Sequence, residues 1–413
     1  MTEIVLITIS GEDKPGLTAT LTEQLGRHDV NILDMGQAVI HDTLSLGILI
    51  EVPGEKESST VMRDLVFKAH ELNVQVKFEP VSEEQYQKWV EAQGKPRYIL
   101  TLLGRKLKAH QISQLADEVY RQGLNIDKIE RLSGRIPLDQ VDTPARACVE
   151  LSLRGLPKDI SRMKEEFIQL GNQLEVDVAF QQDDLYRRNR RLVVFDMDST
   201  LIKTEVIDEL AEAAGVRDEV SKVTELAMQG ELDFKESFRN RVKLLEGLSE
   251  DVLDEIADRL PLNDGAERLI ETLRCIGYKT AILSGGFTYF GKKLQEKLGI
   301  DYVYANELEI KNGKVTGEVT GEIIDGRRKA ELLKEIARKE GIVLEQVIAV
   351  GDGANDVPML NAAGLGIAFH AKPLVKKKTS QAISYNGLDG ILYLIGVRDR
   401  EITRDNLIFS DEN

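Results

Sequence analysis

The chain has 413 residues, of which 42% are apolar and 30% are charged, and this composition is too apolar for a disordered chain. Its 70 acidic side chains outnumber 54 basic ones and give a formal net charge of −16, which argues against binding to nucleic acid or to an anionic membrane surface. The two cysteines lie far apart at Cys148 and Cys275, the first residues lack the basic start of a secretion signal, and no run of about 18 apolar residues is present. We therefore expect a multidomain protein of a reducing cytoplasm.

The first part of the chain repeats one pattern of strands and helices. In each copy an apolar strand is followed by an amphipathic helix, two strands, a second helix and a last strand. The runs of the first copy lie at 4–9, 17–25, 30–40, 44–52, 61–69 and 74–78. Those of the second copy lie at 98–103, 110–122, 125–127, 147–153, 160–170 and 174–180. The order βαββαβ predicts two ferredoxin-like domains, at 1–82 and 96–181, with a linker at 83–95.

The rest of the chain alternates strands with helices after a charged linker at 182–190. Leu192–Phe195 is apolar at every position, which is typical of a parallel strand covered on both faces. Further strands are expected at 279–283, 302–305, 347–350 and 366–368. This alternation predicts a doubly wound α/β domain at 191–398. A helical block at 206–260 is expected to form a cap over the carboxyl edge of the sheet, and 399–413 is expected to be a C-terminal tail.

Two carboxylates follow the first strand of this domain directly. Asp196 and Asp198 point to the same side of the strand end, whereas Met197 points away. Ligands gather at the carboxyl ends of such strands, and two close carboxylates repel each other unless a cation binds them or one is protonated. The pair therefore fits a Mg²⁺ site or a general acid. It also fits a polar turn in which Asp198 or Ser199 caps a helix.

Other segments of the domain carry similar signals. Ser284 and Gly285 follow a strand and offer a hydroxyl and N–H groups to phosphate oxygens, although glycine-rich turns are common. Asp352 and Asp356 follow a later strand within the sequence GDGAND, where glycines let the backbone approach a metal or a phosphate. A solvated loop is the alternative. Lys329 is the least distinctive candidate, because a single lysine is usually solvated surface.

The segments DMDST, SGG, a lysine and GDGAND resemble, in this order, the four motifs of the haloacid dehalogenase-like phosphohydrolase superfamily, over roughly residues 190 to 395. The longer patterns DMDSTLIKTE, SFRNRV and SGGF resemble the phosphoserine phosphatase family within it. This resemblance implies Mg²⁺-dependent hydrolysis of O-phospho-L-serine to L-serine and phosphate, the last step of serine biosynthesis. Two alternatives stay open. One is hydrolysis or transfer of phosphate from another small monoester, and the other is an amino-acid sensor that keeps the fold as a scaffold.

The resemblance also implies roles for the acidic residues. Asp196 is expected to attack phosphorus and form an aspartyl-phosphate. Asp198 is expected to protonate the leaving seryl oxygen and then to take a proton from the water that hydrolyses the intermediate. Mg²⁺ is expected on Asp196, on the main-chain carbonyl of Asp198 and on Asp352. Asp356 is expected to orient Lys329 or a metal-bound water.

The remaining implied roles concern the substrate. Ser284 and the N–H group of Gly285 are expected, together with the lysine, to stabilise charge on the phosphoryl oxygens. Glu205 at the entry of the cap is expected to pair with the substrate ammonium, and Arg241 with the substrate carboxylate. Asn355 is expected to add a hydrogen bond to the substrate. For either charged residue taken alone, solvated helix surface is the simpler interpretation.

The tandem repeat resembles ACT domains, which often bind amino acids and associate through sheets or helices. In the first copy, the loop GEDKPG at 11–16 and Asn31 at the entry to the next strand fit the ACT pattern. The second copy has GRKLKA at 104–109 and lacks the Asp-x-Pro-Gly loop. The resemblance implies an effector site for an amino acid such as L-serine, or a purely structural role in dimerisation. A homodimer is expected, because such domains expose edges that pair with a second copy.

Overall fold

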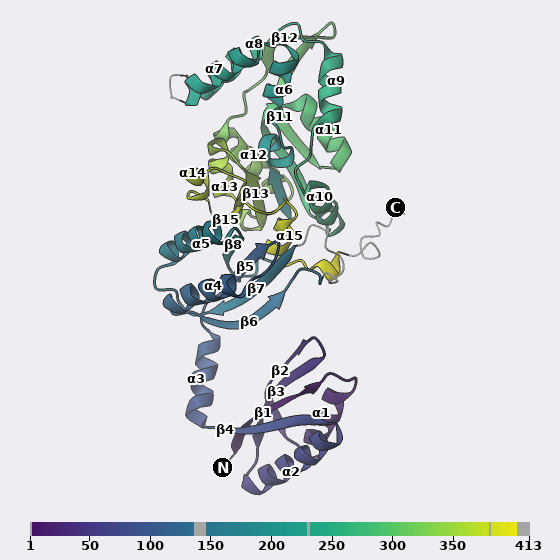
Figure 1. The fold of residues 1–413 in the computed structure, drawn as a ribbon, viewed down its shortest axis with the longest axis vertical. Helices are drawn as coiled ribbons and strands as arrows, with labels where there is room; N and C mark the ends of the chain where they lie inside the picture. The colour runs from purple at the N-terminus through teal and green to yellow at the C-terminus, as the bar shows by residue number, and fades with distance from the viewer. Residues whose placement is uncertain (1, 136–145, 229–231, 380, 403–413) are drawn as a thin grey trace. The chain divides into compact units, whose positions relative to one another are not determined.

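The computed structural model describes residues 2–135, 146–228, 232–379 and 381–402 (Figure 1). The chain divides into two compact units, Met1–Lys95 and Pro96–Asn413. Within the described part of the chain, no helix combines the length and the apolar character needed to cross a bilayer. Residues 229–231 of the predicted cap and 403–413 of the predicted tail lie outside the described residues.

The first unit is a ferredoxin-like domain followed by a helix. Its elements are β1 (Glu3–Glu12), α1 (Leu17–Gly26), β2 (Asn31–Ile40), β3 (Thr43–Val52), α2 (Glu55–Glu71), β4 (Val74–Val81) and α3 (Glu83–Gln93). The antiparallel sheet has the order β2-β3-β1-β4. Inward-facing residues of β1 such as Ile7 alternate with less buried ones and pack with Leu21 of α1. Strand β2 is an edge exposed along nearly its whole length, and α3 buries none of its residues.

The second unit begins with a second ferredoxin-like domain. Its elements are β5 (Arg97–Gly104), α4 (Ala109–Arg121), β6 (Asn125–Arg131), β7 (Ala147–Arg154), α5 (Ile160–Leu174) and β8 (Asp177–Gln182), in a sheet of order β6-β7-β5-β8. Here β5 and β8 are buried on both faces, because the face away from α4 and α5 packs on the following α/β domain. The side chain of Gln381 accepts a hydrogen bond from the Phe180 N–H at 2.9 Å across this contact, and Asn386 donates to Asp177 at 2.7 Å.

The charged stretch at 182–190 is more ordered than its composition indicates. The Arg187 side chain is fully buried and pairs with Glu150 of β7, and Arg190 donates a hydrogen bond to the Glu345 carbonyl at 2.7 Å. The stretch therefore fastens the second ferredoxin-like domain to the α/β domain. A second group of charges does the same, since Asp399 accepts hydrogen bonds from Arg268 at 2.7 Å and from the Gly134 N–H at 2.6 Å.

The α/β domain is built on a seven-stranded sheet of order β12-β11-β10-β9-β13-β14-β15. Its strands are β9 (Leu192–Phe195), β10 (Lys279–Phe287), β11 (Tyr302–Lys311), β12 (Lys314–Thr320), β13 (Val347–Gly351), β14 (Leu365–Phe369) and β15 (Gln381–Ile383). Its main helices are α10 (Ala266–Cys275), α11 (Thr288–Leu298), α12 (Gly326–Lys339), α13 (Val357–Ala362), α14 (Pro373–Lys376) and α15 (Gly390–Leu394). Alternate residues of β9 enter two cores, because Val193 packs on the side of α10 and α11 and Val194 on the side of α12 and α13. The predicted fold class is confirmed.

A helical cap is inserted between β9 and β10 (Figure 1). It comprises α6 (Val206–Ala213), α7 (Arg217–Met228), α8 (Phe234–Lys243) and α9 (Glu250–Arg259). The strand expected at 302–305 is longer than predicted and turns back through β12, the only antiparallel strand of the described sheet. This hairpin supports the cap, because Val315 exchanges main-chain hydrogen bonds with Gly247 and Leu248 at 2.8 and 2.9 Å.

Candidate active site

The parallel strands bring the predicted motifs to one edge of the sheet. Strand β9 lies between β10 and β13 and runs parallel to both. Asp196 follows β9, Ser284 lies in the last part of β10, and Asp352 follows β13. Helix α12 carries Lys329 into the same place, where it contacts Asp196. Residues almost 160 positions apart in sequence are neighbours for this reason.

Lys329 is a buried cation between two carboxylates. Its Nζ lies 2.8 Å from Oδ2 of Asp196 and 2.7 Å from Oδ1 of Asp356, and both Lys329 and Asp356 are 0% exposed. Burial alone would lower the pKa of the ammonium, but the two carboxylates outweigh burial and raise that pKa. The other oxygen of Asp356 accepts a hydrogen bond from the Gly353 N–H at 3.0 Å. Lys329 therefore stays charged and supplies positive charge beside Asp196.

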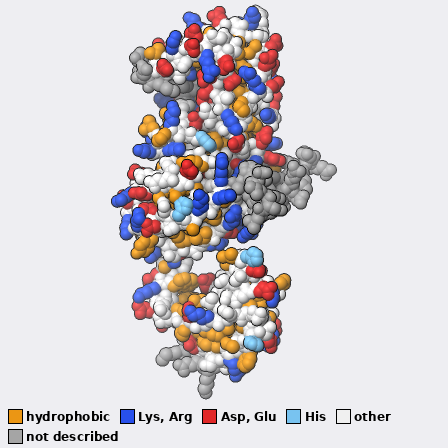
Figure 2. Space-filling view, in the orientation of Figure 1, with side chains coloured by type: hydrophobic (Ala, Val, Ile, Leu, Met, Phe, Trp, Pro, Cys, Tyr) orange, Lys and Arg blue, Asp and Glu red, His pale blue; other side chains and the backbone are white. Residues whose placement is uncertain are grey.

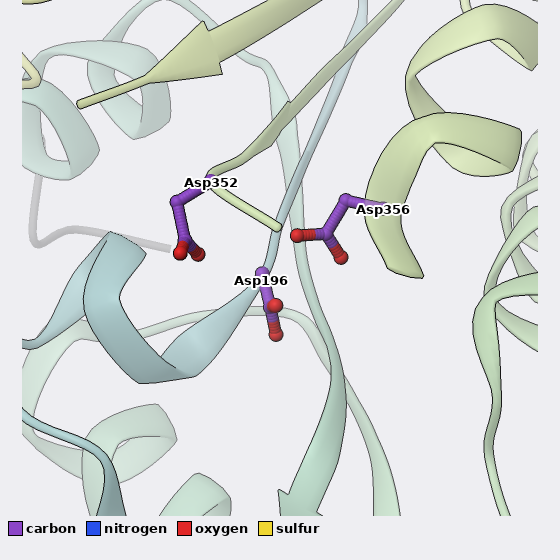
Figure 3. A group of neighbouring side chains, drawn as sticks. All are labelled: Asp196, Asp352 and Asp356. Atoms are coloured by element: carbon purple, nitrogen blue, oxygen red, sulfur yellow. The ribbon is translucent and has the colours of Figure 1, made fainter. Parts of the chain in front are cut away.

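Asp196, Asp352 and Asp356 form an acidic cluster (Figure 3). One oxygen of each carboxylate lies within 4.8 Å of the others; Asp196 comes from the end of β9, and Asp352 and Asp356 come from the loop after β13. Burial, followed by Asp356, raises the pKa of Asp196 well above its usual value, and burial with Asp356 and Glu205 raises the pKa of Asp352 to about 6. A divalent cation at the cluster would favour the charged carboxylates and so lower both pKa values. Carboxylate oxygens are also the ligands that Mg²⁺ prefers. The residues present therefore fit Mg²⁺, with Asp356 already engaged by Lys329.

The Asp198 carboxyl is not a member of this cluster. Its Oδ1 accepts a hydrogen bond from the Val206 N–H at 2.9 Å, and its Oδ2 faces Gly286, where a Cβ atom would lie only 2.5 Å away. Burial and the charge of Glu205 raise the pKa of Asp198 to about 7. A carboxyl with such a pKa both gives and takes protons near neutral pH. A metal contact of this residue would involve its main-chain carbonyl, which stays a prediction.

The loops around the cluster depend on close backbone approach. Ser284 is fully buried, and its Oγ accepts a hydrogen bond from the Gly286 N–H at 2.9 Å, while Gly285 is half-buried between them. Asn355 is half-buried, and its carbonyl lies so near Gly326 that a Cβ atom there would overlap it. Glycine at the first position of α12 therefore lets the helix that carries Lys329 meet the loop after β13.

The cap contributes the two charged residues predicted for substrate recognition. Glu205 precedes α6 and accepts a hydrogen bond from the hydroxyl of Ser199 at 2.6 Å; the backbone of Ser199 is left-handed, with φ 55°. Arg241 lies on α8, half-buried, and its Nε atom is buried without a hydrogen-bond partner among the described residues. Burial lowers the pKa of Arg241, and Glu205, Asp208 and Asp198 oppose this effect. Arg241 thus has an unused donor near Asp198.

The site contains two supporting residues that the sequence analysis did not identify. Thr200 donates a hydrogen bond from its hydroxyl to Asp352 at 3.1 Å. Asn263 donates from its amide to the carbonyls of Thr200 and Ile202, at 2.8 and 3.2 Å, and so holds the segment after Asp196. The only sequence signal for Asn263 is its place in a short polar loop just before a helix, which is common.

The positive charge at this site comes from a buried side chain and not from a basic surface patch. Figure 2 shows basic and acidic side chains intermixed over the visible face of the α/β domain and its cap. The positive charge beside Asp196 is instead the buried ammonium of Lys329. An acidic protein can hold an anionic group in this way, since a buried charge is screened little by solvent.

Comparison with known proteins matches nearly the whole chain. The haloacid dehalogenase-like hydrolase model matches residues 193–361, and two ACT domain models match residues 3–79 and 97–181. A phosphoserine phosphatase of Streptomyces coelicolor is 38% identical over 98% of this chain and 95% of its own length. One of Mycobacterium tuberculosis is 39% identical over 96% of this chain and 94% of its own length. The crystal structure of a probable phosphoserine phosphatase from Vibrio cholerae, in unliganded form, has a TM-score of 0.58 and 37% identity, covering 72% of this chain and 86% of that one.

Proposed function

The chain belongs to the phosphoserine phosphatase family of haloacid dehalogenase-like hydrolases, and we propose that it hydrolyses O-phospho-L-serine through an aspartyl-phosphate, an acyl phosphate on Asp196. The observation that carries this proposal is the pairing of Asp196 with the buried Lys329, beside an Asp198 whose pKa is about 7. This arrangement supplies a nucleophile, a cation and a proton donor together. Neither a scaffold nor a sensor requires all three.

In the first step, a carboxylate oxygen of Asp196 bonds to phosphorus and the bond from phosphorus to the seryl oxygen breaks. Asp198 gives its proton to that oxygen, so L-serine leaves neutral at this atom. In the second step, water attacks the phosphorus of the aspartyl-phosphate, the bond from phosphorus to the Asp196 oxygen breaks, and Asp198 takes a proton from the water. Phosphate leaves, and both carboxyl groups return to their starting states.

Charge on the phosphoryl oxygens is stabilised by three donors. These are the Lys329 ammonium, the Ser284 hydroxyl and the Gly285 N–H. Asp196, Asp352 and the main-chain carbonyl of Asp198 would hold Mg²⁺, which supplies further positive charge for the transferring group. Asp356 fixes Lys329, as supported by the 2.7 Å contact between them.

The cap recognises the serine part of the substrate. Arg241 binds the substrate carboxylate, which is supported by its buried and unpartnered Nε atom. Glu205 binds the ammonium, which is supported by its place at the start of α6 beside Asp198. Asn355 donates a hydrogen bond to the substrate from the loop after β13.

Phosphate release from L-phosphoserine, phosphothreonine, sugar phosphates and p-nitrophenyl phosphate, with and without Mg²⁺, tests this function. We expect Mg²⁺-dependent preference for phosphoserine. Arg241→Ala should raise KM for phosphoserine roughly 10- to 100-fold, as expected when a hydrogen bond to a charged group is lost, and should leave p-nitrophenyl phosphate nearly unaffected. Arg239→Ala, an exposed arginine of the same helix, is the matched control. Equal activity across the panel would contradict the substrate assignment.

We also propose that the first ACT domain binds an amino acid such as L-serine at the loop 11–16. The loop leads into α1 through Gly16, whose φ of 90° favours glycine, and Asp13 is fixed by a hydrogen bond from its N–H to the Asp42 carbonyl at 2.7 Å. Calorimetric titration of the full chain with L-serine should detect binding that Asp13→Ala weakens. Binding that is unchanged in this variant would place the serine elsewhere.

A homodimer is proposed on the exposed edge strand β2. Its residues Ile32, Met35, Val39 and Ile40 are between 39% and 76% exposed, which is unusual for apolar side chains on one strand. Light scattering at micromolar protein should give twice the mass of the chain. A monomeric mass would contradict this proposal.

A further inference from the structure

The segment that carries Ser284 leaves the regular sheet. Strands β10 and β11 pair in parallel at Leu283 with Tyr304 and again at Phe287 with Asn306, and the register shifts between these pairs. Three residues of β10 therefore lie opposite a single residue of β11. Backbone groups in such a bulge lose their regular ladder partners and need others.

The side chain of Asn306 provides those partners. Its Nδ2 donates to the Gly285 carbonyl at 2.8 Å, and its Oδ1 accepts from the Ile324 N–H at 2.8 Å. Asn306 is 2% exposed, so both hydrogen bonds lie away from water. Ile324 immediately precedes Asp325, whose side chain caps the helix that carries Lys329. One amide thus joins the segment of Ser284 to the start of α12.

The same hydrogen bond determines how the Ser284 hydroxyl is used. The Gly285 carbonyl and the Gly286 N–H belong to one peptide group. Asn306 binds its carbonyl end, and its N–H end donates to Ser284 Oγ at 2.9 Å. Because Oγ already accepts this hydrogen bond, the hydroxyl proton is left to point at another acceptor. A chain of donors therefore runs from Asn306 through the peptide to Ser284.

This peptide has little freedom to adopt another orientation. A Cβ atom at Gly286 would lie 2.5 Å from Asp198 Oδ2 and 2.8 Å from the Met197 methyl group. Rotation of the peptide would therefore shift Gly286 in the narrow space beside the Asp198 carboxyl as well as change the hydrogen bond to Ser284. The geometry of two functional groups depends on one peptide plane.

We infer that Asn306 is a positioning residue for phosphoryl transfer, which orients the Gly285–Gly286 peptide so that the Ser284 hydroxyl donates to a phosphoryl oxygen. The inference rests on the proposed phosphatase function. It assigns Asn306 no contact with the substrate. Its effect on the reaction passes through Ser284.

A double-mutant cycle with Asn306→Ala and Ser284→Ala tests this coupling, with each variant measured on phosphoserine and on p-nitrophenyl phosphate. We expect Asn306→Ala to lower kcat roughly 10- to 100-fold on both substrates, less than the ~10²–10³ for loss of a direct donor. When Ser284 is already alanine, Asn306→Ala should lower kcat by less than about threefold, because the hydroxyl through which Asn306 acts is absent. Asn306→Asp keeps an acceptor for the Ile324 N–H but loses the donor to the Gly285 carbonyl. It should therefore lose activity, while its melting temperature should lie nearer to that of the wild type than the melting temperature of Asn306→Ala does.

Thr288→Val is the matched control, because it removes a hydrogen bond to the neighbouring carbonyl of Ala305, at 2.9 Å, without touching the peptide. Equal losses for Thr288→Val and Asn306→Ala would overturn the inference, as would full additivity of Asn306→Ala with Ser284→Ala. A wild type that hydrolyses p-nitrophenyl phosphate but not phosphoserine would contradict the proposed substrate. The cycle on p-nitrophenyl phosphate would still decide the role of Asn306.

Discussion

Replacing Lys329 by methionine should destabilise the catalytic part of the chain as well as inactivate it. The change keeps most of the side-chain volume and removes the ammonium that lies 2.8 Å from Asp196 and 2.7 Å from Asp356. Loss of one partner from a buried ion pair costs about 3–5 kcal/mol, because a charge is left buried without compensation. At about 2–4 °C per kcal/mol for a domain of this size, the melting temperature should fall by roughly 6–20 °C. The value of kcat should fall at least ~10²-fold, as for loss of a transition-state donor.

Calorimetric melting in the presence of a chelator, so that no cation replaces the ammonium, measures the first effect. Arg327→Met is the matched control, because Arg327 lies on the same helix, pairs with Glu331 at 3.1 Å and has an 89% exposed side chain. Exposed pairs contribute about 0–1 kcal/mol, so this control should melt close to the wild type. Adding Asp356→Asn to Lys329→Met should recover part of the lost stability. The reasoning is refuted if Lys329→Met melts within about 2 °C of the wild type.

Three further results are expected. A chelator should abolish phosphate release. Asp352→Asn should raise the Mg²⁺ concentration needed for half-maximal activity at least about tenfold. An unchanged Mg²⁺ titration in this variant would exclude Asp352 as a metal ligand. Asn263→Ala removes the hydrogen bonds to the carbonyls of Thr200 and Ile202 and should lower kcat about tenfold in steady-state measurements. If this variant has the kcat of the wild type, the segment after Asp196 keeps its position without Asn263. Burial alone would raise the pKa of Asp399, but hydrogen bonds from the Gly134 N–H and Arg268 lower it. The Asp399 carboxylate therefore stabilises the folded chain above its unfolded pKa of about 3.9, and this stabilisation is lost as pH falls through the lower folded pKa. The difference in melting temperature between the wild type and Asp399→Asn should be full near pH 6 and should shrink below about pH 4. A difference that does not depend on pH would contradict this.

The fold was predictable because its signals are local and repeated. The all-apolar run Leu192–Phe195 and the later runs of the same kind indicated a parallel sheet, and the two βαββαβ patterns indicated the ACT domains. Parallel strands meet at one edge, so the chain positions of Asp196 and Asp352 were enough to predict that they are neighbours. The place of Lys329 in the site was predicted only from the family resemblance, because a lysine at a helix start is usually solvated and nothing in its local sequence indicates burial.

The residues that support the site were not predictable for a different reason. Asn306 and Asn263 stand in ordinary sequences, and their importance comes from a strand bulge and a loop that exist only in the folded chain. Likewise, the charges at 182–190 suggested a linker, but in the folded chain Arg187 of this stretch is buried and pairs with Glu150 of β7. Pairings between distant polar residues leave no periodic trace in a single sequence.

The two ACT domains differ in how they pack with the elements that follow them. The first lies in a compact unit of its own, in which the sheet packs on α1 and α2 and the following helix α3 buries none of its residues. The second gives both faces of β5 and β8 to packing and has been absorbed into the enzyme as a subdomain. The chain thus contains two copies of one fold, and the second packs on the catalytic domain through the sheet face that its own helices leave uncovered. Sequence change on the outer face of β5 is therefore limited by its packing on the catalytic domain, a constraint that comes in addition to the demands of its own helices.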